Sequence, residues 1–135
     1  METPLSPVTD RRRWPLRALR AVLVVHLLVV LGQPLTAGRY LTGDVDAIAW
    51  HATTGSLLAA VGLALVAAAL VHVVAGRGRW EVLPAAVGVF LADGVQIDQG
   101  FERALQVHVP LGVGIAVASV LFAAWAWTPA AGRTR

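Results

Sequence analysis

The chain has 135 residues, of which 57% are hydrophobic and 14% are charged, and its mean hydropathy is +0.69. A soluble domain is typically about a quarter charged, so this composition argues against a soluble enzyme and against a disordered chain. All eleven basic residues are arginine, and they lie at the margins of long apolar runs rather than on the basic face that nucleic-acid binding requires. The absence of cysteine excludes disulfides, thiolate catalysis, iron–sulfur clusters and c-type haem attachment.

Four apolar segments are long enough to cross a bilayer, which takes about 20 residues. They cover residues 19–38, 48–75, 82–100 and 105–127. Each is expected to be helical, because backbone groups in lipid must be paired within the segment, and the short connections predict antiparallel neighbours. The sequence therefore predicts an all-α, integral membrane, up-down-up-down four-helix bundle over residues 19–127. An arginine-rich tail over residues 1–18 and a second tail over residues 128–135 flank it.

The arginines predict the orientation of this bundle. If the chain crosses four times, nine of the eleven fall on one side, which the positive-inside rule makes cytoplasmic together with both termini. A cleaved signal peptide is the alternative for the first segment, but Gln33-Pro34 interrupts the region where a cleavage site would be prepared. The nine arginines are Arg11, Arg12, Arg13, Arg17, Arg20, Arg77, Arg79, Arg133 and Arg135.

A short pattern occurs twice and predicts a weak internal two-fold repeat. A glutamine in one segment precedes a histidine at the start of the next, and a glycine follows that histidine four residues later. Equivalent residues of such a repeat would face one another across the bundle. The first set is Gln33, His51 and Gly55, and the second is Gln96, His108 and Gly112.

Two histidines at one depth suit a b-type haem. Haem iron takes two axial ligands on opposite faces of its macrocycle, and His51 and His108 could supply them. Gly55 and Gly112 lie one turn further on the same faces, where the missing side chains would leave room for the porphyrin edge. The alternative is that the glycines only allow close helix packing and that the histidines bond to backbone.

His26 and His72 form a second candidate pair, which we expect on the cytoplasmic side. A second haem there would give a two-haem path across the membrane. Otherwise these residues are hydrogen-bonding partners between helices.

Asp93 must lie within the membrane, because a third helix that ended before it would be too short to span. Gln96 shares its face, and we expect Asp93 in the bundle interior near Gln96, His51 or His108. There it could accept a hydrogen bond from a ligand imidazole or relay a proton. The alternative is a protonated or water-bonded carboxyl near the interface.

Arg39 and Arg103 are the only cations expected on the outer side, and each could pair with a haem propionate. The alternative for each is a plain salt bridge to an acidic neighbour, namely Asp44, Asp98 or Glu102.

In these motifs the chain resembles an uncharacterised family of bacterial four-helix membrane proteins, a domain of unknown function, over about residues 20–122. It is also similar to one half of haem A synthase and, more loosely, to b-type cytochrome bundles. These resemblances imply a bacterial inner-membrane location and outer-side haem ligation by His51 and His108. The haem A synthase family has a glutamate three residues before the first of these histidines, where this chain has Ile48, so haem hydroxylation is not implied.

Three functions remain open. The first is a haem-binding membrane protein that exchanges electrons with a quinone or a redox partner protein. The second is a transporter or channel subunit, and the third is a cofactor-free assembly partner embedded in lipid. Nothing in the chain resembles a nucleotide site, a Ser–His–Asp set or a nucleic-acid-binding face, so we do not expect an enzyme in its own right.

Overall fold

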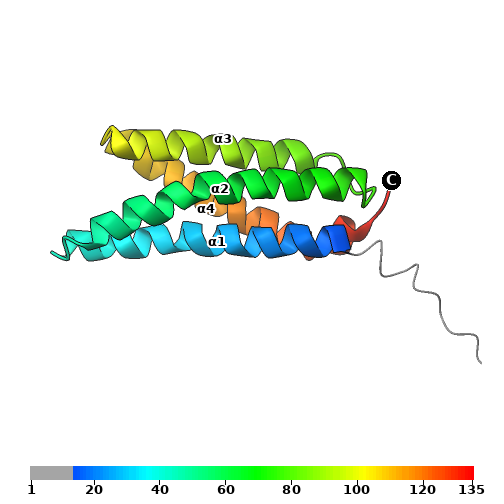
Figure 1. Ribbon diagram of the computed structural model, residues 1–135, viewed down its shortest axis with the longest axis horizontal. Coiled ribbons are helices and arrows are strands. Elements are labelled where there is room, and N and C mark those ends of the chain that lie inside the picture. Colours follow the sequence, from blue (N-terminus) through cyan, green and yellow to red (C-terminus); the bar gives the residue numbers. More distant parts are fainter. Residues whose placement is uncertain (1–13) are drawn as a thin grey trace, which may run out of the picture.

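The computed structural model describes residues 14–135. Residues 1–13, which include Arg11, Arg12 and Arg13 of the expected tail, lie outside the described part. Within residues 14–135 there are four α-helices, one short 3₁₀ helix and no strand, so the predicted all-α, four-helix fold is confirmed (Figure 1). The elements are α1 (Trp14–Leu41), α2 (Ala47–Val74), α3 (Val82–Phe101), α4 (Leu105–Ala126) and η2 (Pro129–Gly132).

The first helix is longer than expected. It begins at Trp14 rather than at residue 19 and ends at Leu41 rather than at residue 38. Hydropathy marks only the apolar stretch, whereas the turn before it contains good helix formers such as Arg17, which extend the helix. Pro34 lies inside this helix without ending it. The expected bounds of the other three helices agree with the structure to within one residue.

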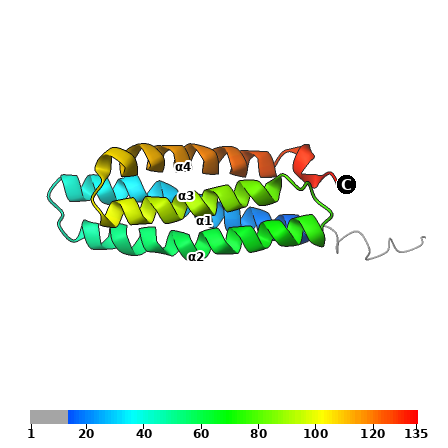
Figure 2. The same ribbon diagram turned by 90° about the horizontal axis from the view of Figure 1, so that it is seen from above.

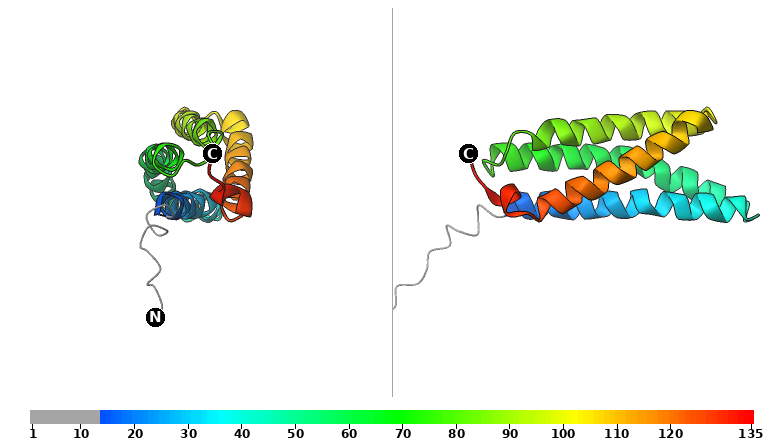
Figure 3. Two further views of the ribbon diagram at one scale, coloured as in Figure 1. Left: turned by 90° about the vertical axis from the view of Figure 1, so that its right-hand side faces the viewer. Right: turned by 180° about the vertical axis from the view of Figure 1, so that it is seen from behind.

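The helices form a four-membered ring in which α1 contacts α2, α2 contacts α3, α3 contacts α4 and α4 contacts α1. Figure 2 and the left panel of Figure 3 show this arrangement from above and along the bundle. The helix α4 crosses the bundle obliquely, from beside α1 at one end to beside α3 at the other (Figure 3, right). The helices are therefore not parallel rods, and the two ends of the bundle differ.

We call the two ends the terminal end and the far end. The terminal end holds the start of α1, the α2–α3 connection and the C-terminal segment, and the far end holds the other two connections (Figure 1). At the terminal end the backbone N–H of Arg135 donates to the carbonyl oxygen of Arg77 at 2.9 Å. The main core lies between this end and the middle of the bundle, and small alanines allow its helices to pack closely. Its buried members are Leu19, Leu23, Leu65, Ala69, Val82, Ala86, Val89 and Ala126.

Three helices, α1, α2 and α4, are long and apolar enough to cross a membrane, while α3 does not reach that level of hydropathy. Large apolar side chains nevertheless lie exposed near the middle of every helix: Leu28 is 66% exposed, Leu63 58%, Leu91 60% and Val117 54%. Soluble monomers rarely show a continuous apolar surface of this kind, whereas a bundle in lipid requires one. The fold thus supports a membrane protein.

We expect Gly62→Leu to lower the thermal unfolding midpoint strongly. A Cβ atom at Gly62 would lie 3.0 Å from Cδ2 of Phe90 and 3.1 Å from Oδ2 of Asp93. A leucine there would overpack the centre of the bundle and lower the free energy of unfolding by about 3 kcal/mol. The matched control is Gly88→Leu, because a Cβ atom at Gly88 meets nothing within 4 Å. Circular dichroism melts of both variants in detergent would test this, and equal midpoints would contradict the packing described here.

Candidate functional site

A cavity of about 490 Å³ opens between the helices at the far end. All four helices contribute to its lining, because α4 diverges from α1 there. Its volume lies within the range of small-molecule and cofactor sites, roughly 300–1,000 Å³. We call it the far cavity. Its chemically active lining residues are Gln33, His51, Gln96, Arg103 and His108.

The imidazole of His51 is oriented by the preceding helix. Its Nδ1 atom lies 3.2 Å from the backbone carbonyl oxygen of Gln33 and 3.1 Å from Oγ1 of Thr36. A carbonyl oxygen can only accept a hydrogen bond, so this contact assigns the proton to Nδ1. In the Nδ1–H tautomer the Nε2 atom of His51 carries the lone pair, and the hydrogen bonds of this ring within residues 14–135 involve Nδ1 alone.

The imidazole of His108 is held in the same way. Its Nδ1 atom donates to the backbone carbonyl oxygen of Gln96 at 2.9 Å. Its Nε2 atom therefore carries the lone pair, and the side-chain amide of Gln96 donates to it at a long 3.4 Å. The amide oxygen Oε1 of Gln96 is buried and has no partner within the described residues. In His108, as in His51, Nδ1 contacts a backbone carbonyl oxygen and Nε2 lies on the other side of the ring.

The structure brings the two imidazoles together across the bundle. Their ring centroids lie 6.0 Å apart, and their planes are inclined by 66°. Two iron–nitrogen bonds of about 2 Å and about 1 Å from each nitrogen to its ring centroid give about 6 Å for two opposed axial ligands. The observed separation of the centroids is compatible with such a pair.

The two glycines act differently from the expectation. A Cβ atom on Gly55 would lie 3.2 Å from Oε1 of Gln33, and one on Gly112 would lie 2.8 Å from Nε2 of Gln96. Each glycine therefore makes room for the glutamine side chain of the preceding helix, and at Gly112 this side chain takes the space expected for a porphyrin edge. The close-packing alternative describes Gly112, while Gly55 also lines the far cavity.

The two glutamine–histidine–glycine sets make similar contacts. In each half, one glutamine orients the histidine through its backbone carbonyl and covers the glycine with its side chain. The glutamine-to-histidine spacing differs, because 51 − 33 is 18 and 108 − 96 is 12. The additional residues of the first set lie mainly in a longer end of α1 and in a longer connection, beyond the contacting groups themselves.

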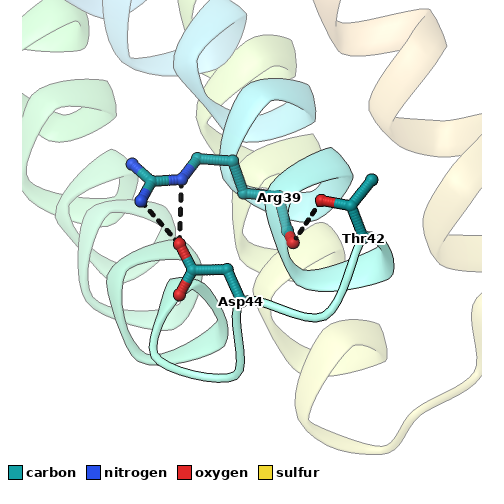
Figure 4. A network of polar contacts seen from close by, with 3 residues as sticks. All are labelled: Arg39, Thr42 and Asp44. Carbon is teal, nitrogen blue, oxygen red and sulfur yellow. Dashed lines mark hydrogen bonds and ion pairs between the residues drawn. The ribbon is translucent and has the colours of Figure 1, made fainter.

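The two expected cations separate. The guanidinium of Arg39 donates from Nε and Nη2 to Oδ2 of Asp44, at 3.0 and 2.5 Å, and the Thr42 hydroxyl donates to the Arg39 carbonyl oxygen at 2.9 Å (Figure 4). The side chain of Arg39 is largely exposed and does not line the far cavity, so the salt-bridge alternative holds for it. Arg103 does line the cavity and has a positive φ of 57°.

Asp93 faces the interior as expected, but its partner is a different histidine. Its Oδ2 atom lies 2.8 Å from Nε2 of His26, and both residues are 0% exposed. The hydroxyl of Ser119 lies 3.3 Å from the other ring nitrogen, Nδ1, of His26. The option that Asp93 accepts a hydrogen bond from His51 or His108 is not the one seen here, because its Oδ2 atom contacts His26 of α1 near the middle of the bundle.

His26 and His72 do not form a pair. His72 lies at the terminal end, where it lines a cavity together with Leu16 of α1. His26 lies ten residues further along α1 than Leu16, which is about 15 Å of helix. No second two-histidine site exists between them, since His26 is engaged by Asp93 and Ser119.

The cluster of His26, Asp93 and Ser119 was not found from the sequence. Their positions along the helices could have indicated it, since His26 and Asp93 both lie near the middle of their helices. An ionisable residue at that depth requires a partner at the same level. The expected start of α1 at residue 19 placed His26 too near the helix end for this match.

The donor set of the far cavity is two imidazoles. Among the described residues, no group of three or more His, Cys, Asp or Glu side chains could hold a metal ion. Zinc sites typically use three or four protein ligands, so two imidazoles are too few to bind a bare zinc ion well. A haem iron receives four of its ligands from the porphyrin and takes only two from the protein, so the two imidazoles fit that group.

No protein-family model, curated protein or solved structure matches this chain. The resemblance to haem A synthase and to the bacterial four-helix family gains no support from these comparisons. Function is therefore inferred from the geometry of the residues.

We expect Asp93→Ala to destabilise the bundle by about 3 kcal/mol, because it leaves the buried ring of His26 without its carboxyl partner. His26→Ala should cost a similar amount, and the double variant should cost clearly less than the sum of the two, as contacting residues do. Thermal melts in detergent measure all three. Asp98→Ala is the control, since that carboxylate is exposed and bonds only its neighbour Gln99. Strict additivity would show that the pair is not coupled.

Proposed function

We propose that this chain is an integral membrane protein that binds one b-type haem between His51 and His108 and carries electrons to or from a quinone or a redox partner protein. One observation carries the proposal. Two imidazoles from equivalent positions of a repeat are held by Nδ1–H contacts to backbone carbonyls, and their centroids lie 6.0 Å apart beside one cavity. A hydrogen bond from Nδ1–H to a carbonyl fixes the tautomer and the ring plane of a histidine that ligates a metal through Nε2.

The residues around the cavity suit the parts of this cofactor. His51 and His108 would supply the axial nitrogens, and Arg103 would face a propionate carboxylate. Bound haem supplies reversible one-electron chemistry. The contribution of the chain is to hold two imidazoles and to surround them with mainly apolar lining such as Ile48, Leu58 and Ile97.

The proposed placement in the membrane uses all four helices. The polar residues near the middle of α3 turn inward, because Asp93 bonds to His26 and Gln96 bonds to His108, while Leu91 faces outward. This arrangement supports α3 as a fourth span despite its lower hydropathy. The terminal end would then lie in the cytoplasm of a bacterial inner membrane, since it collects Arg17, Arg20, Arg77, Arg79, Arg133 and Arg135.

A proton-coupled transporter is the second candidate. The observation in its favour is Asp93, which is wholly buried and whose Oδ1 atom has no partner among the described residues. Against it, neither Asp93 nor His26 lines the far cavity or the cavity at the terminal end, so no described path leads to them.

The haem proposal predicts a coloured protein. Purified from cells supplied with haem, the wild type should show a Soret band that shifts on reduction. His51→Ala and His108→Ala should each remove the bound haem or alter its spectrum grossly, because one axial ligand is lost. His72→Ala is the matched control and should keep the spectrum, since His72 lies at the other end of the bundle. A colourless wild-type protein would overturn the proposal.

The topology predicts that Gly43 and Gly78 lie on opposite sides of the membrane, with Gly43 outside. They fall in the α1–α2 and α2–α3 connections, at opposite ends of the bundle. Reporter fusions truncated after each residue measure the side directly. Fusions that report the same side would contradict four spans, and an inverted pattern would contradict the assigned orientation.

A further inference from the structure

A second cavity of about 420 Å³ lies at the terminal end, and we call it the terminal cavity. Three parts of the chain form it: the start of α1, the end of α2 with the α2–α3 connection, and the segment after α4. None of its lining residues is acidic. Its ionisable lining residues are Arg17, Arg20, His72 and Arg133.

His72 is the buried polar group of this cavity. The residue is only 3% exposed, and neither of its ring nitrogens has a hydrogen-bond partner among residues 14–135. The backbone of Gly78 packs directly on the ring, since a Cβ atom there would lie 2.2 Å from Nε2. Buried polar atoms without a hydrogen-bond partner are costly in free energy. We therefore expect a polar partner for the His72 ring in the cavity that it lines.

Contacts at the edge of the cavity hold Arg20 and the C-terminal segment in place. Nε of Arg20 donates to the carbonyl oxygen of Ala126 at 2.8 Å, and its guanidinium lies 5.4 Å from the ring centroid of Trp127. The side chain of Arg135 donates to the carbonyl oxygen of Gly78 at 2.9 Å. This contact ties the C-terminal segment to the α2–α3 connection and so brings Arg133 to the cavity.

We propose that the terminal cavity binds a negatively charged phosphate group, either in the headgroup of an anionic phospholipid or in a free phosphate. Arginine side chains match the oxygens of phosphate geometrically, and the start of α1 adds the positive end of a helix dipole. The volume leaves room for the glycerol part of a headgroup beside the phosphate. Basic pockets at the cytoplasmic surface of membrane bundles face a leaflet rich in anionic lipid. This proposal does not depend on haem binding at the far end.

The test is the thermal unfolding midpoint of the full-length protein in a neutral detergent at constant ionic strength. The probes are short-chain phosphatidylglycerol, short-chain phosphatidylcholine and inorganic phosphate. We expect phosphatidylglycerol to raise the midpoint by several degrees and phosphatidylcholine to leave it unchanged. A shift with phosphatidylglycerol alone supports a lipid site, and an equal shift with inorganic phosphate supports a site for free phosphate. No shift with either overturns the proposal.

Variants separate specific binding from a general charge effect. Arg133→Gln should at least halve the shift, whereas Arg79→Gln should keep it, because Arg79 lies outside the cavity and donates to Glu81 at 2.8 Å. His72→Leu should raise the midpoint without added ligand and reduce the shift, since it removes the unmatched nitrogens. A purely structural histidine would give a lower midpoint instead. An undiminished shift in both Arg133→Gln and His72→Leu overturns the proposal.

Discussion

The bundle depends on one buried contact, the 2.8 Å pair between His26 of α1 and Asp93 of α3. These two helices are not neighbours in the ring, so the pair connects them across its middle. Ser119 extends the contact to α4, and Gly62 of α2 has no side chain where Oδ2 of Asp93 passes. All four helices are thereby fixed at one level. In an apolar surrounding such a pair cannot separate cheaply, so it sets both the rotation and the height of each helix.

The two ends of the molecule follow from this central layer. Toward the terminal end, alanines let the helices close around a continuous core, and the arginine side chains gather beyond it. Toward the far end, α4 leaves α1 and moves to α3, and the space between the two hairpins becomes the far cavity. Gln33 and Gln96 each make two contacts beside this cavity. The backbone carbonyl of each glutamine orients a histidine, and its side chain covers a glycine. The same two glutamines therefore determine how the histidines are oriented and how the space around them is filled.

The sequence was sufficient for those features that depend on hydropathy along the chain. It predicted four helices, nearly correct bounds for α2, α3 and α4, and the matched positions of His51 and His108. It failed where helix rotation and register matter. The pairing of Asp93 with His26 requires the relative height of α1 and α3, which an early start of α1 altered. The role of Gly55 and Gly112 required the direction of the glutamine side chains, and a glycine in a sequence shows only that space is needed, not what fills it.

The position of the chain ends has a consequence for how the polypeptide could be rearranged. The C-terminal segment reaches the α2–α3 connection at the same end of the bundle at which α1 begins. The residues of the far cavity belong to two hairpins, α1–α2 and α3–α4, which the chain joins through that connection. A circular permutant that joined the old termini and opened the chain near Gly78 would present the hairpins in reversed order. It would keep each glutamine–histidine–glycine set within an unbroken segment, so the order of the two halves along the chain is interchangeable for this geometry.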